Sequence, residues 1–220
     1  MTVLKPAAFF DLDGTLITGN SGLLWMKHER RLGRLSTYEL TMGTLYFFLY
    51  KIRAIDMLRA TRNALGTITG REETELATEI ASWYENEVKP YTAADGLAAI
   101  EKHRQQGHRL VLLTSCSIYE AKVATADFKL DDYLCTRYEV KDGRFTGDFI
   151  EPLCYGEGKV IHAERFAREH NIDVDASYFY TDSCTDLPML ERVSYPRVVN
   201  PDVRLRWVAK RKGWPILNWI

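Results

Sequence analysis

The spacing of apolar residues changes along the chain and predicts a strand followed by a long helical region. Residues 3–10 form a short apolar run that ends in an aspartate-glycine turn, which is typical of a buried parallel strand. From about residue 20 to residue 89 the pattern is helical, and Ser36-x-x-Glu39 and Thr69-x-x-Glu72 both match the capping box that begins a helix. After the second box, apolar residues that share one helical face run up to Pro90, which is expected to end the helix: Leu76, Ile80, Trp83 and Val88.

Beyond residue 90 the pattern alternates between helices and strands. It predicts helices near residues 92–106, after Ser117, at 159–170 and near Leu187, strands at 109–114, 178–181 and 197–199, and a hairpin at 133–149 that turns at Asp142–Gly143. Such alternation indicates an α/β fold, with a doubly wound, Rossmann-like parallel sheet core and a helical cap inserted after the first strand. We expect residues 1–18 and 90–220 to form the core, and residues 19–89 to form a cap above the carboxyl ends of the strands.

Composition and charge exclude several classes of protein. Hydrophobic residues make up 46% and charged residues 27% of the 220 residues, which is ordinary globular usage and not that of a disordered chain. The 29 basic and 30 acidic side chains leave a net charge of -1, so no overall basic field is available to bind nucleic acid. One local basic cluster is expected to be a solvated helix face and not a phosphate- or lipid-binding patch: Arg204, Arg206, Lys210, Arg211 and Lys212.

The sequence carries none of the signals that we would expect of an exported or membrane-inserted protein. The longest apolar run, residues 45–50, is far shorter than the ~20 residues of a spanning helix, and aspartates interrupt the apolar stretch near the N-terminus. The four cysteines show neither C-x-x-C pairing nor zinc-ligand spacing, which favours free thiols in a reducing compartment. We therefore expect a cytoplasmic protein without stable membrane insertion.

Polar residues of catalytic types lie at the ends of the predicted strands or at the start of a helix. Asp11, Asp13 and Gly14 follow the first strand, Ser115 follows the second, Lys159 begins a helix, and Asp182 and Asp186 follow the strand at 178–181. Carboxylates gathered at one edge of a sheet repel one another, so they require a cation, and an all-oxygen donor set favours Mg2+. Lys159, the Ser115 hydroxyl and backbone N–H groups of the turn that contains Gly14 would bind a phosphate, which is the equipment of phosphoryl transfer.

These residues carry a resemblance to a known family. FFDLDGTL, LLTSCS, GEGK and YTDSCTDLPML, in this order, resemble the four motifs of the haloacid dehalogenase superfamily. The helical insertion after the first motif and the segment VVNPD resemble its phosphoserine-phosphatase-like branch. The resemblance extends from Phe9 to about Asp202 and implies a phosphatase of small phosphorylated metabolites.

The resemblance also implies individual roles. Asp11 would be the nucleophile that forms an aspartyl-phosphate, and Asp13 the general acid and base. Mg2+ would bind Asp11, Asp182 and the backbone carbonyl of Asp13, and Asp186 would steady the metal site or Lys159 from behind. Ser115 would hold a phosphate oxygen, although a shift of one residue at the strand end would give that place to Thr114.

The substrate is less well specified. Phosphoserine phosphatases of this branch typically have a glutamate shortly after the first motif, whereas residues 17–21 contain no acid and offer only Asn20 as a candidate substrate contact. Cys116 and Ser117 replace the two glycines that usually follow the second-motif serine, and Thr181 replaces the glycine before Asp182. The sequence therefore predicts a small phosphomonoester without choosing phosphoserine.

Several alternatives remain open at this point. A phosphotransferase would use the same aspartyl-phosphate, and a non-catalytic binding protein could share the fold, whereas Asp13 argues against dehalogenation because a halide leaves without a proton. A receiver domain is disfavoured because it would be about half this length and would lack the helical insertion.

Cys116 and Cys184 could form a redox switch but are better interpreted as small buried side chains that fill space in the core. An aromatic stripe belongs either to the core of the helical insertion or to a pocket wall: Tyr46, Phe47, Phe48 and Tyr50. The oligomeric state is not predicted.

Overall fold

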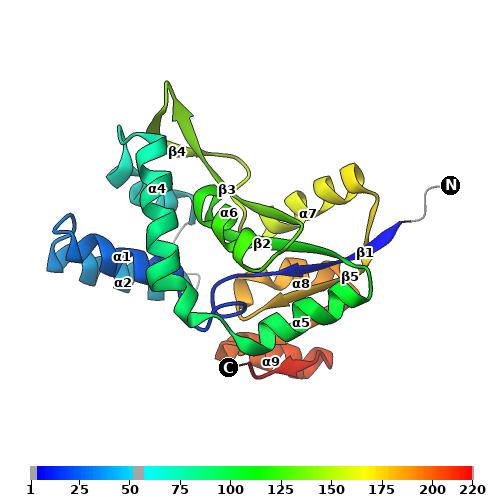
Figure 1. Ribbon diagram of the computed structural model, residues 1–220. Coiled ribbons are helices and arrows are strands. Elements are labelled where there is room, and N and C mark those ends of the chain that lie inside the picture. The colour runs from blue at the N-terminus through cyan, green and yellow to red at the C-terminus, as the bar shows by residue number, and fades with distance from the viewer. Residues whose placement is uncertain (1–3, 52–56, 220) are drawn as a thin grey trace.

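The computed structural model describes residues 4–51 and 57–219, apart from the side chains of residues 46–51. The described residues form a seven-stranded sheet with the strand order β4-β3-β2-β1-β5-β6-β7 (Figure 1). The strands are β1 (Lys5–Phe10), β2 (Arg109–Ser117), β3 (Asp132–Lys141), β4 (Arg144–Ile150), β5 (Ile172–Thr181), β6 (Tyr195–Val199) and β7 (Ile216–Leu217). All neighbouring strands are parallel except β3 and β4. Because the first strand is central and later strands are added on both sides of it, the predicted doubly wound α/β fold is confirmed.

Helices cover both faces of this sheet because successive residues of β1 point to opposite sides. Ala8 and Phe10 join one apolar core with α5 (Ala94–Gln105) and α6 (Ile118–Asp127). Ala7 and Phe9 join a second core with three later helices: α7 (Glu157–His170), α8 (Leu187–Arg192) and α9 (Val203–Lys212). Burial on both faces explains why β1 is a continuous apolar run.

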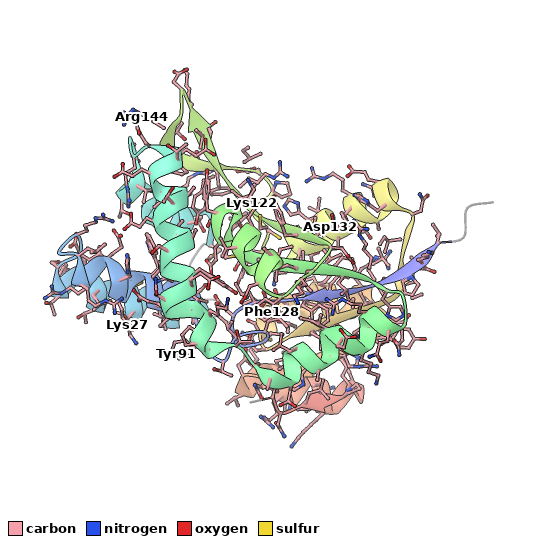
Figure 2. The ribbon with its side chains drawn as sticks, viewed as in Figure 1. Lys27, Tyr91, Lys122, Phe128, Asp132 and Arg144 are labelled. Carbon is pink, nitrogen blue, oxygen red and sulfur yellow. The ribbon has the colours of Figure 1, made fainter. Side chains whose placement is uncertain are left out.

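The insertion between β1 and β2 is helical, as expected. It contains α1 (Ser21–Arg31), α2 (Thr37–Lys51), α3 (Met57–Leu65) and α4 (Glu73–Trp83). Figure 1 shows α1, α2 and α4 beyond the edge of the sheet at which β1 ends. The hairpin of β3 and β4 supports the insertion from the core: the Gly70 N–H donates to the Phe145 carbonyl at 2.8 Å, and Arg144 pairs with Glu72 at 2.9 Å (Figure 2). The division at residues 18 and 89 remains a prediction.

The two predicted capping boxes have different outcomes. In the first, the Ser36 N–H donates to Glu39 at 2.7 Å and the Glu39 N–H donates to the Ser36 hydroxyl at 3.2 Å, which confirms it. The second is wrong, because α4 begins after Glu72, and Thr69 ends a short 3-10 turn at Gly66–Ile68. Thr69 instead packs against the hairpin, where a Cβ on Gly147 would lie 2.3 Å from its hydroxyl oxygen.

Pro90 does not end the helix directly. The predicted apolar face is buried at Leu76, Ile80 and Trp83. However, α4 ends at Trp83, and a π-helical turn over Tyr84–Val88 follows it. Pro90 then lies in the first turn of a 3-10 helix, Lys89–Tyr91, where its missing N–H leaves no intrahelical bond unmade. The wider π turn accounts for the difference from one continuous helix.

Several other predictions can be compared with the structure. The hairpin turn is confirmed, since Asp142 and Gly143 both have positive φ, at 51° and 74°. The basic residues of α9 are exposed, as a solvated face requires. Among the described residues, no helix is long and apolar enough to cross a membrane. The side chains of the stripe Tyr46, Phe47, Phe48 and Tyr50 lie outside the described ones.

Candidate active site

The candidate site lies at the carboxyl ends of the central strands. Asp11 directly follows β1, and its backbone N–H donates to the Tyr180 carbonyl of β5 at 2.9 Å. The parallel register pairs Phe10 with Leu112 on one side and with Tyr180 on the other. Side chains at the carboxyl ends of β1, β2 and β5 therefore converge, and this register explains why residues far apart in the sequence meet.

Lys159 is the buried cation of the site. It lies in the first turn of α7, is 2% exposed, and its Nζ contacts Asp186 Oδ2 at 2.7 Å and Asp11 Oδ1 at 3.1 Å. The Thr181 hydroxyl donates to the same Asp186 oxygen at 2.7 Å. Burial by itself lowers the pKa of Lys159, but Asp11 and Asp186 together raise it by more, so the ammonium stays charged. Asp186 thus holds the lysine in place beside Asp11.

Negative charge exceeds positive charge around Asp11. Burial raises the pKa of Asp11 well above its usual value; Lys159 opposes this shift, whereas Asp186, Asp182 and Asp13 add to it. Within the described part of the chain, no group of three or more His, Cys, Asp or Glu side chains is arranged to hold a metal ion. The predicted magnesium ligands, however, include only two side chains, Asp11 and Asp182, with Asp13 contributing its backbone carbonyl. The oxygen donors and the uncompensated charge fit a hard divalent cation.

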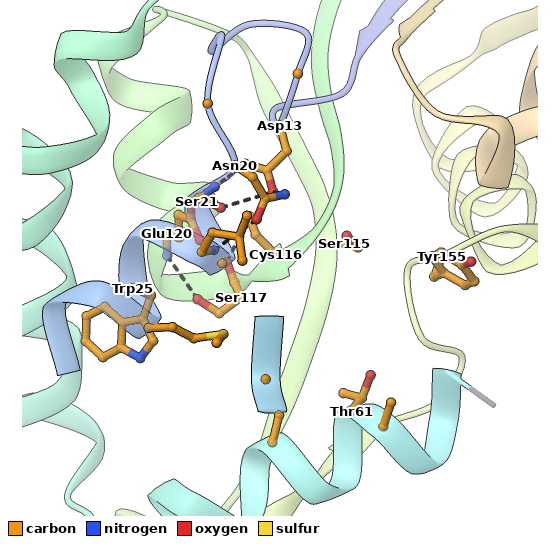
Figure 3. Close-up of a pocket in the computed structure, with 18 of the residues that line it drawn as sticks. Asp13, Asn20, Ser21, Trp25, Thr61, Ser115, Cys116, Ser117, Glu120 and Tyr155 are labelled. Carbon is orange, nitrogen blue, oxygen red and sulfur yellow. Dashed lines mark hydrogen bonds between the residues drawn. The ribbon is translucent and has the colours of Figure 1, made fainter. Parts of the chain in front are cut away.

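The carboxylate of Asp13 is held by the first residues of the helical insertion (Figure 3). The Ser21 N–H donates to Oδ1 at 2.7 Å, while the Ser21 hydroxyl and the Asn20 amide donate to Oδ2 at 3.2 and 3.1 Å. Asn20 also caps α1, because its side-chain oxygen accepts from the Leu23 N–H at 3.0 Å. Asn20, predicted as a substrate contact, therefore has two structural partners here, and the substrate contact stays a prediction.

Gly14 makes the turn that follows Asp13 possible. It has a positive φ of 68°, and a Cβ at this position would lie 2.5 Å from Asp182 Oδ2. Its N–H donates to the Gly19 carbonyl at 3.0 Å. The predicted phosphate contact of the Gly14 N–H stays a prediction, and the glycine lets Asp182 approach the turn.

Of the two candidate hydroxyls near the carboxyl end of β2, which extends to Ser117 and not only to residue 114 as predicted, Ser115 is the better placed. Ser115 lines the cavity of the site, whereas the Thr114 side chain is buried and its oxygen accepts from the Cys116 N–H at 3.3 Å. The residue that caps α6 is Ser117, not Ser115, because the Ser117 hydroxyl accepts from the Glu120 N–H. The predicted contact of Ser115 with a phosphate oxygen stays a prediction.

Comparison with known proteins decides the family. The model of the haloacid dehalogenase-like hydrolases matches residues 8–191 of the chain. The chain belongs to this family. A relative named phosphoserine phosphatase SerB1, from Mycobacterium tuberculosis, is 31% identical over 98% of this hydrolase and 71% of its own length. A relative named histidinol-phosphatase, from Neisseria meningitidis, is 28% identical to this chain. The match covers 98% of this chain and the whole length of the relative.

A solved structure agrees with this assignment at the level of the fold. A protein of unknown function from Bordetella pertussis is similar with a TM-score of 0.88, at 25% identity, over 98% of this chain and 99% of its own. The family match and the names of the relatives together make the chain a phosphatase of the haloacid dehalogenase-like hydrolases, as the four motifs predicted.

A cavity of about 870 Å³ opens from the carboxylates of this hydrolase toward the helical insertion. Asp11, Asp13, Lys159 and Asp182 line its polar end. Its remaining wall is largely apolar and comes from α1, α3 and α4: Trp25, Met57, Leu65, Leu76, Ile80 and Trp83. The volume suits a small ligand.

Glu120 is a cavity residue that the sequence analysis missed. Its side chain is buried in the first turn of α6 and lines the cavity near Asp13. Burial raises the pKa of Glu120 to about 8, Asp13 adds to the shift, and hydrogen bonds with Ser21 and Cys116 oppose it. A glutamate three residues after a serine matches a capping box, so the sequence alone would have assigned it to the start of a helix.

All four cysteines are free thiols, and burial raises the pKa of Cys116.

Replacing Gly158 with alanine should destabilise the hydrolase. Gly158 precedes Lys159 in α7, and a Cβ there would lie 1.9 Å from the Leu153 carbonyl oxygen. Because the clash involves backbone, we expect a loss of about 2–4 kcal/mol and a melting temperature lower by about 5–15 °C. The matched control is Gly66→Ala, where a Cβ meets nothing within 4 Å and should be harmless. Equal melting curves for Gly158→Ala and the parent would contradict this close approach.

Proposed function

We propose that this phosphatase hydrolyses a small phosphomonoester with Mg2+ through an aspartyl-phosphate on Asp11. The observation that supports it most is the placement of two aspartates with different partners at one end of the cavity. Asp11 is oriented by Lys159 at 3.1 Å, and Asp13 is held by the N-terminus of α1. One carboxylate is thus oriented by a cation and the other by hydrogen-bond donors, so the two aspartates have different environments although they are two residues apart.

In the first step an Asp11 oxygen attacks phosphorus, and the bond from phosphorus to the ester oxygen breaks. Asp13 gives its proton to the departing alkoxide and becomes a carboxylate, which the two donor groups of Ser21 and the Asn20 amide stabilise. In the second step Asp13 takes a proton from water, and the resulting hydroxide attacks the phosphorus of the aspartyl-phosphate. Inorganic phosphate leaves and the Asp11 carboxylate is regenerated.

The remaining residues would bind the phosphoryl group and the metal. Lys159 and Ser115 would donate to phosphate oxygens, and Asp186 would keep Lys159 directed at the site. The side chains of Asp11 and Asp182 and the carbonyl of Asp13 would hold Mg2+. When bound, the ion supplies the positive charge that allows a phosphate dianion to approach Asp11.

The substrate would place its leaving group in the apolar part of the cavity, beneath the proposed cap of residues 19–89. The cavity is bounded by side chains of α1, α3 and α4, so a small phosphorylated metabolite fits better than a protein segment. Histidinol phosphate and phosphoserine are the first candidates, because the names of two relatives point to them.

The test is phosphate release from a panel of esters, each measured with Mg2+ and with EDTA. The panel contains an aryl phosphate, phosphoserine, histidinol phosphate, phosphocholine and a lysophosphatidate. We expect release from at least one ester with Mg2+ and at least about a hundredfold less with EDTA. A folded protein, judged by its melting curve, that is silent on every ester including the aryl phosphate would contradict the proposal.

A further inference from the structure

Glu120 lines the cavity, and one of its carboxyl oxygens is buried and unpartnered. The side chain is 7% exposed, and among the described residues Oε1 has no hydrogen-bond partner. Its carboxyl interacts with Ser21 and Cys116, so Glu120 lies beside the residue that holds Asp13 (Figure 3). A buried acceptor without a donor is costly. A ligand that brings a donor to this wall would remove that cost.

The surroundings of Glu120 favour a cationic donor. Lys159 is the one lysine or arginine among the described residues that line the cavity, and it is already paired with Asp11 and Asp186. Asp13, in the turn after β1, adds negative charge near Glu120. Trp25 adds an aromatic ring to the same cavity, and rings of this kind attract ammonium groups.

We propose that Glu120 selects the leaving group by accepting a hydrogen bond from the protonated amine of a phosphorylated amino alcohol. The inference rests on the proposed function, since it places the phosphate of the ester at Asp11 and the amine of the leaving group at Glu120 of α6. Glu120 would act as a specificity residue: its interaction is lost for an ester without the amine, while the steps at Asp11 and Asp13 are unchanged.

The test compares phosphoethanolamine with ethyl phosphate and 2-hydroxyethyl phosphate, for the parent and for Glu120→Gln. The glutamine keeps the size of the side chain but cannot ionise, whereas a bound ammonium group favours the carboxylate form of Glu120. We expect kcat/KM for phosphoethanolamine to fall about 10- to 100-fold, mainly through KM, because a charged buried hydrogen bond is lost. Hydrolysis of the two amine-free esters should change by less than about threefold.

The matched control is Glu29→Gln. Glu29 also lines the cavity, but its carboxylate is paired with Arg34 at 3.0 Å, so the preference for the amine should not change. An equal loss on all three esters in Glu120→Gln would overturn the proposal, because Glu120 would then act on the shared chemistry. A preference for the hydroxyl ester over the amine ester in the parent would overturn it too.

A second measurement separates this inference from the proposed function. Calorimetry on the Asp11→Asn protein reports binding of phosphoethanolamine and of ethyl phosphate without turnover. Tighter binding of the amine ester, lost when Glu120→Gln is added, would support the inference even if the parent released no phosphate. Equal binding of the two esters would contradict it even in an active phosphatase.

Discussion

The Asp11→Asn protein is expected to release phosphate more than about 1,000-fold more slowly than the parent from every ester. An amide nitrogen and oxygen of the same shape replace the carboxylate, so the nucleophile is lost while the packing after β1 is retained. Asp11 is 7% exposed and 3.1 Å from Lys159, which leaves little room for another group to take its place. Phosphate release and acid-quenched trapping of the phosphorylated protein both check this result.

Two readouts distinguish a lost nucleophile from a damaged fold. Asp13, Asp182 and Asp186 each raise the pKa of Asp11, so removing this charge relieves repulsion and should not lower the melting temperature in EDTA. Adding Mg2+ should raise the melting temperature of the parent and do so less in the variant. The matched control, Asp175→Asn, changes an exposed aspartate and should keep full activity. Substantial phosphate release by Asp11→Asn would assign the nucleophile elsewhere.

The strand ends of the site are predictable because they follow from local pattern. Each apolar run that ends in a polar residue leaves that residue at the edge of the sheet, and parallel strands share that edge. This reasoning places Asp11, Ser115 and Asp182 near one another from the sequence alone. An interaction between Asp186 and Lys159 could be expected from the motifs, but the 2.7 Å distance between Lys159 Nζ and Asp186 Oδ2 depends on how α7 packs.

Other parts of the site depend on tertiary packing and could not be predicted. The Glu120 side chain reaches the cavity because of how α6 packs against the sheet. The spacing of residues within the helix does not predict this packing. Thr69 matches a capping box in sequence, yet the contact with Gly147 of the hairpin, far along the chain, gives it another role. Local rules describe caps and turns, whereas partners distant in sequence decide between them.

The helical insertion is also coupled to the chemistry in a way that the motifs do not state. The donors that hold Asp13 come from Asn20 and Ser21, which begin α1 and belong to the insertion. Any displacement of α1 would therefore move donors away from the proposed general acid. We therefore expect the insertion to position the proposed acid as well as to line the cavity.

Replacing Asp13 with asparagine should produce a loss that depends on the leaving group. Asparagine cannot donate an acidic proton to an alkoxide, so hydrolysis of alkyl phosphates should slow at least about a hundredfold. Aryl phosphates should slow much less in the first step, because a phenolate leaves without much protonation. The measurement is the rate of aspartyl-phosphate formation for a series of esters whose leaving alcohols differ in pKa. As the pKa of the alcohol rises, this rate should fall more steeply for the variant than for the parent.

The same series tests the role of the donors around Asp13. Asn20→Ala removes one of the hydrogen bonds to Oδ2 and the cap of α1, so it should steepen the dependence on the leaving group less than Asp13→Asn does. Water activation in the second step also needs Asp13, so the asparagine variant should accumulate phosphorylated Asp11 when an aryl phosphate is the substrate. A uniform loss across all leaving groups, without accumulation of the intermediate, would show that Asp13 positions the phosphate and does not transfer a proton.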